Sequence, residues 1–448
     1  MAVENIGKKD FVWTILATIF KIGAGVLLLP LILRKLPSET VGIWTIFATI
    51  TQLTGLFDFG FNPSFARNVA YVFSGVRSLK KEGYVAVEDV NSVDYSLLAR
   101  TIRAMRYFYS RMAVVLFVLF ATVGTMYVYT LTRDYMGDER EVFVAWIVVV
   151  LVNSYNLYTL YYESLLNGRG LIKQSQQIIF VGNFVYVVFA SILILLDCGL
   201  IAIVSSQAIS VFLVRYLSKR AFYTDEIKTN LLSVDDSDYK QVLSVIMPNA
   251  VKVGLTSLGG FIINKSSVFI GSLFVSLEMM ASYGITMQLL TVIGTFGGIF
   301  TRVYLPKIFQ WRVEGRKDLV KKIFYLSSGV MFVVFALSSV IIVLWGDWML
   351  TMLHSGTMLL PTGLLILAFV QYYLEYNHSN SAQYLLSKNE VPFFKASLLS
   401  AVGVLVLLGI FVVWLDFGLL GMILAPTLAQ AVYQNWKWPL EVIKEFRN

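Results

Sequence analysis

The chain contains few of the residues from which catalytic and metal sites are commonly built. Its single cysteine, Cys198, excludes an intrachain disulfide and a thiolate metal cluster. Its two histidines, His354 and His378, are too few and too far apart in the sequence to indicate a histidine metal site. Charged residues make up only 14% of the chain, well below the share that is usual in soluble domains. We therefore expect no metal and no cofactor.

Apolar residues are abundant instead: they make up 57% of the chain, and the mean hydropathy is +0.71. Runs of about 20 apolar residues, the length that crosses a bilayer, recur along the whole sequence and leave no room for a soluble domain. The first run is full length and lacks a small-residue cleavage site, so we expect no cleaved signal peptide. Because a chain in lipid must satisfy its own backbone hydrogen bonds, we predict an all-α, polytopic membrane protein. Its twelve predicted spans are 11–33, 41–62, 109–131, 142–165, 176–196, 199–217, 243–272, 281–304, 323–345, 359–380, 394–414 and 419–437.

Lysine and arginine fall mainly on one side of the predicted membrane. With the N-terminus in the cytoplasm, 29 of the 36 basic residues lie in cytoplasmic segments and four lie on the opposite face. Because cytoplasmic loops carry an excess of these residues, we predict that both termini are cytoplasmic. The same asymmetry accounts for the net charge of +8 without a nucleic-acid partner. Binding of anionic lipids is the alternative use of this basic rim.

One basic segment, residues 93–112, has a pattern of its own. Its apolar residues recur at helical spacing and arginines stand between them, so we predict an amphipathic surface helix that leads into the third span. The apolar positions are Leu97, Leu98, Ile102, Met105 and Tyr109, and the arginines are Arg100, Arg103 and Arg106.

Three short motifs recur in the same order in the two halves of the chain. The clearest is LLDCGLIAI at 195–203, which matches WLDFGLLGM at 414–422 with an offset of 219. The repeat predicts two six-helix lobes in the same orientation, residues 1–218 and 242–448, joined by a cytoplasmic linker at 219–241. The other two pairs are 164–170 with 384–390, and 38–44 with 279–285, which aligns Gly42 with Gly284.

Three lysines, Lys21, Lys252 and Lys265, lie inside predicted spans. Lys21 is roughly 15 Å from either end of its helix, and a lysine at that depth costs about 2.5–3.5 kcal/mol unless it faces a partner or a watery cavity. By the repeat, Lys21 falls opposite Ile263, two residues from Lys265. Two such ammonium groups predict a phosphate or pyrophosphate site, with Lys252 as an entry contact. The alternatives are that each lysine neutralises a nearby carboxylate or carbonyl, or that Lys21 snorkels to the interface.

Three carboxylates are candidates for binding a coupling cation, H⁺ or Na⁺. Glu375 lies deepest in its span, with His378 one turn later, and desolvation favours a usable proton affinity at such a place. Glu163 lies at the end of the fourth span, where pairing with Arg169 is the favoured reading. Asp58 is expected to cap or pair at a helix end, with Arg67 as one partner.

Tyrosine and asparagine cluster in the fourth and tenth spans, at Tyr155 and Asn156 and again around Tyr376. Such side chains fit a groove for sugars and equally fit the aromatic belt of a membrane protein, and the sequence leaves both open. The repeated Leu-Asp-x-Gly-Leu motif has a structural interpretation: a tight outer hairpin with the glycine in the turn.

The N-terminal motif resembles a known family. Pro30, Ile32, Leu36, Glu39, Gly42 and Trp44 are followed by Asp58, Phe59, Gly60 and Arg67. This order resembles the start of Wzx-type polysaccharide flippases, within the MATE-like (MOP) superfamily of lipid-linked oligosaccharide and drug exporters. The loop of about 45 residues after the second span is longer than that family leads us to expect, and its role stays open.

The resemblance implies two six-helix lobes that form a V around an alternating-access cavity. It also implies a substrate, an undecaprenyl-pyrophosphate-linked oligosaccharide (an O-antigen or capsule repeat unit) that moves across the bacterial inner membrane. We expect a monomeric transporter, not an enzyme. The candidate substrate-binding residues are Lys21, Lys265, Lys252, Arg67, Tyr155, Asn156 and Tyr376, and the candidate ion-coupling residues are Glu375, Glu163 and Asp58.

Other classes fit the sequence less well. A MATE-like, cation-coupled exporter of small amphipathic compounds is the closest alternative, but buried lysines favour an anionic substrate. A sugar porter of the major facilitator type needs a short basic second loop, and this loop is long. A polymerase or glycosyltransferase needs a large outer loop for catalytic groups, whereas the predicted outer loops are short.

Overall fold

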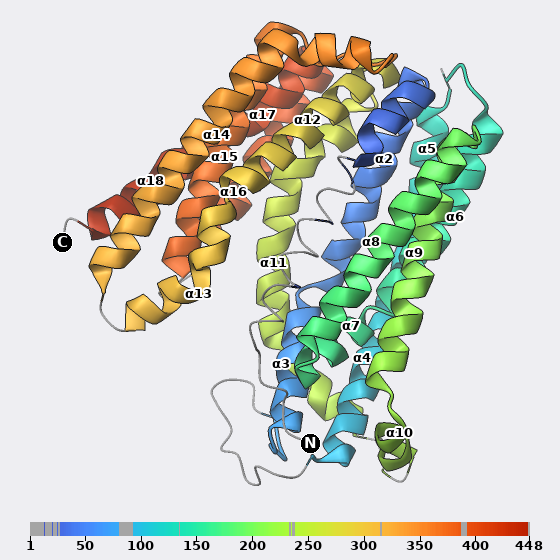
Figure 1. Ribbon diagram of the computed structural model, residues 1–448, viewed down its shortest axis with the longest axis vertical. Helices are drawn as coiled ribbons and strands as arrows, with labels where there is room; N and C mark the ends of the chain where they lie inside the picture. The colour runs from blue at the N-terminus through green and yellow to red at the C-terminus, as the bar shows by residue number, and fades with distance from the viewer. Residues whose placement is uncertain are drawn as a thin grey trace. The chain divides into compact units, whose positions relative to one another are not determined.

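The computed structural model describes residues 13, 20, 25, 27–79, 93–133, 135–232, 234, 238–313, 316–386 and 392–446. Every regular element within these ranges is a helix, and no strand occurs among them (Figure 1). The all-α prediction is therefore confirmed. The described part of each predicted span is mainly helical. Among the described residues, eight helical segments are long and apolar enough to cross a membrane, as a polytopic membrane protein requires.

The chain forms two compact units. The first comprises Met1–Lys35 and Ile50–Ser257, and the second comprises Leu36–Thr49 and Leu258–Asn448. The division therefore falls inside helix α11 (Tyr239–Gly271), whereas the repeat predicts it in the linker 219–241. The physical reason is that α11 runs unbroken for 33 residues, so its beginning packs with the first unit. Most of the predicted linker is helical too, because α9 continues to Phe222 and α10 follows it.

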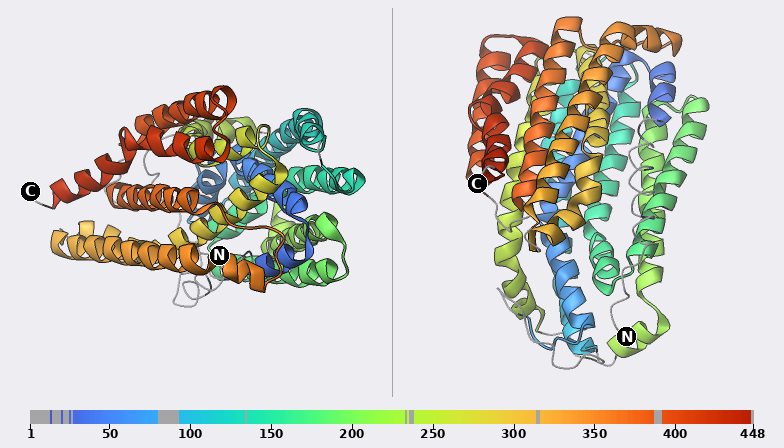
Figure 2. Two further views of the ribbon diagram at one scale, coloured as in Figure 1. Left: turned by 90° about the horizontal axis from the view of Figure 1, so that it is seen from above. Right: turned by 60° about the vertical axis from the view of Figure 1, so that its left-hand side comes forward.

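Helices of the first unit pack against their neighbours in sequence and also against helices that are distant in sequence. Helices α8 and α9 lie side by side along their lengths, α6 packs on α9, and α3 packs on α7 (Figures 1 and 2). Phe61 of α3 and Phe108 of α4 stack with ring centroids 3.8 Å apart, beside the fully buried Phe65 and Tyr109. The helices are α2 (Ser38–Leu53, which begins in the second unit), η1 (Thr54–Asp58), α3 (Phe61–Phe73), α4 (Tyr95–Leu119), η2 (Phe120–Gly124), α5 (Thr125–Leu131), α6 (Glu139–Tyr158), α7 (Tyr161–Arg169), α8 (Ile172–Leu195), α9 (Gly199–Phe222) and α10 (Asp225–Leu232).

The second unit has a separate core. Phe324, Tyr384 and Trp438 belong to a buried cluster to which five helices contribute. Helix α14 packs on α12 and α15, and α15 packs on α18. The helices are α12 (Leu277–Gly297), α13 (Ile299–Val313), α14 (Lys317–Met352), α15 (Thr362–Leu386), α16 (Phe394–Leu408), η3 (Gly409–Trp414), α17 (Gly418–Ala431) and α18 (Gln434–Glu445).

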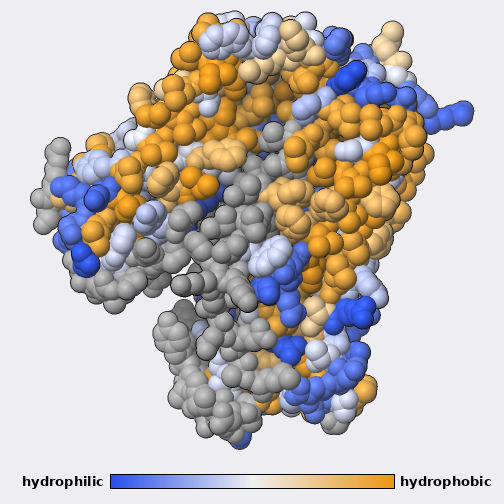
Figure 3. Space-filling view, viewed as in Figure 1, coloured by the Kyte–Doolittle hydropathy of each residue, from blue (hydrophilic) through white to orange (hydrophobic). Residues whose placement is uncertain are grey.

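Large apolar side chains are exposed along the helices of both units. Leu337 and Leu344 of α14 are 60% and 64% exposed, and Phe184 of α8 is 51% exposed. In the face shown in Figure 3, hydrophobic residues cover most of α14 and of α8 and α9. Apolar patches of this extent are costly in water and favourable in lipid. The exposed surface therefore supports the membrane-spanning character of both units.

The repeated Leu-Asp-x-Gly-Leu motif makes the same turn twice. Asp197 and Gly199 both have φ of 55°, and Asp416 and Gly418 both have φ of 51°. Each motif lies between two helices, α8 and α9 in the first unit and η3 and α17 in the second. The predicted hairpin is thus confirmed, and the aspartate shares the left-handed backbone with the glycine. Asn and Asp are the non-glycine residues that tolerate this conformation best, which explains the motif.

The predicted amphipathic surface helix is instead the first half of α4, which runs without a break into the third span. Its apolar face is buried as predicted: Leu98 and Met105 are both 0% exposed. That face packs on protein, against helices α3, α6 and α10. The long predicted loop is correspondingly shorter, because α3 extends to Phe73 and α4 begins at Tyr95. Sequence periodicity identified the apolar face, but it could not distinguish protein from lipid as its partner.

Two glycines that the repeat aligns lie where helices α2 and α12 approach each other in the second unit. A Cβ at Gly42 would overlap the backbone carbonyl oxygen of Leu277, and a Cβ at Gly284 would overlap the side chain of Thr45. Helices α2 and α12 therefore cross at a distance that only glycine allows at these positions. Repeat-equivalent helices meeting through equivalent glycines agree with the predicted internal duplication.

Gly42→Ala is expected to destabilise the protein by about 1–3 kcal/mol, because overpacking against backbone cannot be relieved by a rotamer change. The measurement is thermal or denaturant unfolding in detergent. Gly329→Ala is the matched control, since a Cβ at this α14 position meets no heavy atom within 4 Å; alanine there should be neutral or slightly stabilising. Equal stability of both variants would contradict the close crossing.

Candidate functional site

The three candidate lysines differ in how the structure describes them. Lys21 lies outside the described residues, and so does the side chain of Lys252, although its backbone belongs to α11. Lys265 is described: it lies in α11 and is half-buried. In the described part of the chain, no hydrogen bond or ion pair joins Lys265 to a carboxylate or a carbonyl. A half-buried cation without an internal counter-ion is a candidate for binding an external anion.

Asp58 ends η1 and organises the turn into α3. Its Oδ1 accepts a hydrogen bond from the backbone N–H of Asn62 at 2.9 Å and from the hydroxyl of Tyr109 at 2.6 Å. Asp58 thus caps a helix start, as expected, but its side-chain partner is Tyr109 and not Arg67. Arg67 is exposed on α3. The Phe59 and Gly60 that follow Asp58 both have positive φ, so the Asp-Phe-Gly segment is a tight turn that fixes the carboxylate against α4.

The same unit contains a buried arginine on helix α9. Arg215 of α9 is 6% exposed and donates to Oδ1 of Asn156 from Nη2 at 2.6 Å and from Nε at 3.2 Å. Glu163 of α7 is close enough to Arg215 to attract it electrostatically. The predicted partner of Glu163, Arg169, instead donates to the carbonyl oxygen of Phe222 at 3.3 Å. Among the described residues, Glu163 therefore has an electrostatic attraction to Arg215 and no ion pair with Arg169.

This arrangement engages two residues that were candidates for a sugar groove. Asn156 uses its side-chain oxygen for Arg215, and Tyr155 packs its ring on Phe212 with centroids 4.6 Å apart. The contacts of both residues lie inside the first unit. Sequence analysis did not single out Arg215. The sequence did contain one indication: Arg215 lies inside the sixth predicted span, 199–217, where a charged residue needs a partner.

Arg215→Met is expected to destabilise the protein by about 3–5 kcal/mol, because Glu163 and Asn156 lose a buried cation. Unfolding in detergent measures this effect, with Arg220→Met as the matched control on the exposed end of α9; that change should stay within about 0.5 kcal/mol. Adding Glu163→Gln should restore part of the lost stability, since the uncompensated charge is then gone. No recovery in the double variant would contradict the pairing.

The third candidate carboxylate lies in the second unit. Within the described residues, Oε2 of Glu375 is buried and has no hydrogen-bond partner, and the same is true of Oε1 of Gln371. The two residues are four apart on α15 and therefore lie on one face, one turn from each other. Two buried oxygen acceptors without donors are costly, and a proton or a small cation would satisfy both.

Tyrosines on α15 surround this position. Tyr372 and Tyr376 stack with ring centroids 6.3 Å apart, and both are close enough to Glu375 to interact with it electrostatically. The hydroxyl of Tyr376 donates to the carbonyl oxygen of Thr291 in α12 at 3.2 Å. The Nδ1 of His378 lies 3.0 Å from Oδ1 of Asn435. Glu375 is thus the candidate for ion binding, and His378 belongs to a separate contact.

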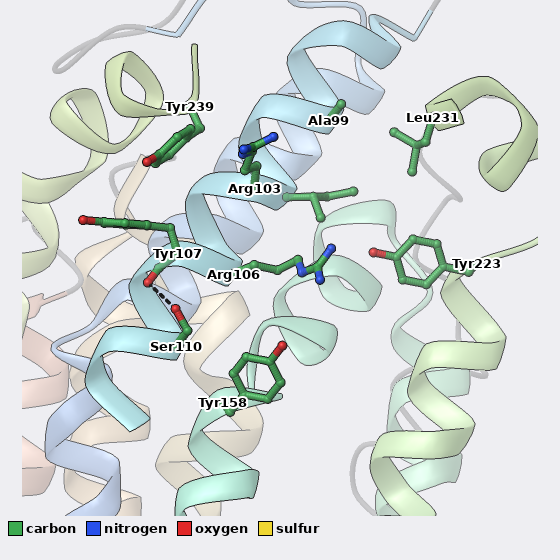
Figure 4. Close-up of a pocket in the computed structure, with 10 residues that line it drawn as sticks. Ala99, Arg103, Arg106, Tyr107, Ser110, Tyr158, Tyr223, Leu231 and Tyr239 are labelled. Carbon is green, nitrogen blue, oxygen red and sulfur yellow. Dashed lines mark hydrogen bonds between the residues drawn. The ribbon is translucent and has the colours of Figure 1, made fainter. Parts of the chain in front are cut away.

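A polar pocket in the first unit was not predicted from the sequence. It has a volume of about 570 Å³ and is lined by residues of α4, α6, α10 and α11 and by Tyr223 just after α9. Arg103 and Arg106 of α4 point toward it together with Tyr158 and Tyr223 (Figure 4). Burial raises the pKa of Tyr223 to about 12, so its hydroxyl stays protonated and can donate a hydrogen bond.

Comparison with known proteins gives a fold. No protein-family model matches the chain, and no curated protein matches its sequence. The structure of the lipid II flippase MurJ in an inward closed conformation is similar, with a TM-score of 0.65 at 12% identity over 98% of this chain and 88% of that one. An inward-facing multidrug resistance MATE transporter of the MOP superfamily is similar too, with a TM-score of 0.56 at 13% identity over 96% of this chain and 95% of that one. The chain has the fold of the MOP superfamily transporters.

Proposed function

We propose that this chain is a flippase that moves an undecaprenyl-pyrophosphate-linked oligosaccharide, an O-antigen or capsule repeat unit, across the bacterial inner membrane by alternating access. The observation that carries the proposal is Lys265, which is half-buried in α11 without a counter-ion in the described part of the chain. Its position favours an anionic substrate. The fold shared with a lipid II flippase and the N-terminal motif that resembles Wzx-type flippases support the same substrate class.

The proposed substrate contacts follow the sequence analysis. Lys21 and Lys265 bind the pyrophosphate, and Lys252 is a contact at the entry. Arg67, which is exposed on α3, is a further contact of the substrate. Tyr376 contacts sugars; Tyr155 and Asn156, which were candidates for the same role, make internal contacts with Phe212 and Arg215. The protein acts as a monomer with both termini in the cytoplasm, and this orientation rests on the distribution of lysine and arginine.

A second candidate function is a cation-coupled exporter of small amphipathic compounds. The oxygens of Gln371 and Glu375 that have no hydrogen-bond partner among the described residues favour it, because a site for H⁺ or Na⁺ is what such coupling needs. The same site serves an ion-coupled flippase equally well. The charge of the substrate separates the two functions: Lys265 favours an anion and disfavours an organic cation.

The test is translocation in proteoliposomes that contain the purified full-length chain. A defined undecaprenyl-pyrophosphate-linked oligosaccharide is placed in the outer leaflet, and its movement is followed by protection from an added glycosidase. Parallel vesicles carry a proton gradient, a sodium gradient or none, and a second set is loaded with an organic cation dye. Movement of the lipid-linked oligosaccharide without dye export supports the flippase, and dye export alone supports the exporter.

A further inference from the structure

The pocket at the beginning of α4 gathers positive charge and hydroxyl groups in one place. Arg103 and Arg106 are one helical turn apart on α4, both are exposed, and both line the pocket. Residues spaced by three on a helix lie on the same face, so both guanidinium groups reach one space. None of the ten lining residues, all within the described part of the chain, carries a carboxylate. The pocket is therefore electropositive and matches an anion.

Aromatic rings hold the two arginines in place. The guanidinium of Arg103 lies 5.5 Å from the ring centroid of Tyr239, which in turn packs on Tyr107 with centroids 5.2 Å apart. Arg106 extends toward Tyr223 and lies above Tyr158 (Figure 4), and it interacts electrostatically with both hydroxyls. Guanidinium groups held by rings lose little freedom when they bind a ligand. The walls come from helices that are distant in sequence, so the site is formed by the fold.

The size and chemistry of the pocket restrict the kind of ligand that it can bind. Two guanidinium groups offer paired N–H donors that match the oxygens of phosphate, and the hydroxyls of Tyr158 and Tyr223 add single donors. The volume of about 570 Å³ lies within the range of about 300–1,000 Å³ that is usual for small-molecule sites. It accommodates more than a bare ion. A phosphate together with the group that carries it fits both properties.

The other arginines of the same helix differ from Arg103 and Arg106 in where their side chains lie. Arg100 donates from Nε to the carbonyl oxygen of Ser96 at 3.4 Å, and Arg111 lies over the ring of Tyr107 at 5.3 Å. Neither lines the pocket. If the arginines served only to orient the chain in the membrane, their side chains would not need to converge with tyrosine hydroxyls in a concave site.

We propose that this pocket is a binding site for a phosphate-bearing headgroup, held by the guanidinium groups of Arg103 and Arg106 and by the hydroxyls of Tyr158 and Tyr223. The proposal is independent of the translocated substrate and goes beyond it. The phosphate belongs either to an anionic membrane lipid or to a soluble diphosphate, and the same contacts serve both.

Binding to the full-length protein in nanodiscs tests the proposal and distinguishes the two sources. In phosphatidylcholine discs, isothermal titration calorimetry measures the dissociation constant for inorganic pyrophosphate. In discs that also contain phosphatidylglycerol, native mass spectrometry counts the phosphatidylglycerol molecules that stay bound. The variants are Arg103→Gln with Arg106→Gln, Arg106→Lys, and Arg100→Gln as the matched loss of one charge outside the pocket. Thermal unfolding of each variant checks that it is folded.

At least one probe is expected to bind to the wild-type protein. The double glutamine variant should weaken that binding about tenfold or more, since hydrogen bonds to charged groups are lost. Arg100→Gln should stay within about twofold, and Arg106→Lys should fall between the two because charge remains while the paired donors are lost. Binding of pyrophosphate alone identifies a soluble diphosphate, and retention of phosphatidylglycerol alone identifies a lipid headgroup. The proposal is wrong if neither probe binds, or if the double variant binds like wild type. Neither readout involves translocation, so a failure here is separate from a failure of the proposed flippase.

Discussion

Lys265→Ala is expected to lower translocation of a lipid-linked oligosaccharide about tenfold or more while leaving the stability of the protein almost unchanged. The reason is that Lys265 is half-buried and, within the described residues, makes no hydrogen bond or ion pair that its loss would break. A lysine that binds a pyrophosphate contributes a charge-assisted hydrogen bond, and losing such a bond costs about 1.5–3 kcal/mol. Lys265→Arg should keep part of the activity, since charge remains while donor geometry changes.

To decide whether Lys265 binds substrate or stabilises the fold, transport per folded molecule and thermal stability are both measured for each variant. Lys395→Ala is the matched control in the same unit, because Lys395 is exposed at the start of α16; it should change neither quantity. Lys21→Ala should behave like Lys265→Ala if the two lysines act as a pair. Lost stability with normal transport per molecule would mean that Lys265 is a structural cation, and the pyrophosphate assignment would then be wrong.

The sequence predicted the architecture well, because the signals for it are local. Apolar runs of bilayer length identify spans without any knowledge of packing, and the described part of each of them is mainly helical. The Leu-Asp-x-Gly-Leu repeat predicted two hairpins, and both have the same left-handed pair of residues. In these cases a short stretch of chain determines its own conformation.

The candidate site could be predicted only in part, because contacts between distant residues leave no local pattern. Nothing near Arg215 in the sequence shows that its guanidinium reaches Asn156, 59 residues away. Glu163 and Arg169 are near each other in the sequence, but they are six residues apart on α7 and so do not share a face of the helix. Arg169 reaches the end of α9 instead. The arginines of α4 were noticed as a stripe, but the tyrosines that complete their pocket come from three other parts of the chain.

Glu375→Gln is expected to abolish any dependence of transport on a proton or sodium gradient. The motivating observation is the pair of buried oxygens on Glu375 and Gln371 that have no hydrogen-bond partner within the described residues. Burying an acceptor without a donor costs about 1–3 kcal/mol, and more when the group is charged, so an ionised Glu375 needs a cation there. Glutamine is neutral and nearly isosteric. It cannot gain or lose a proton, and it attracts Na⁺ far less.

The assay compares transport across a series of pH values and across sodium gradients for wild type, Glu375→Gln and Glu441→Gln. Glu441 pairs with Lys437 at 3.1 Å on the exposed side of α18, so its replacement removes an equal charge without touching a buried site and should leave the dependence as in wild type. Glu163→Gln tests a second candidate carboxylate: because Glu163 attracts the buried Arg215 electrostatically, its loss should affect stability and leave coupling intact. Glu375 acts as the coupling residue only if its variant alone loses the gradient dependence. A dependence that persists unchanged in both Glu375→Gln and Glu163→Gln would exclude coupling through either carboxylate.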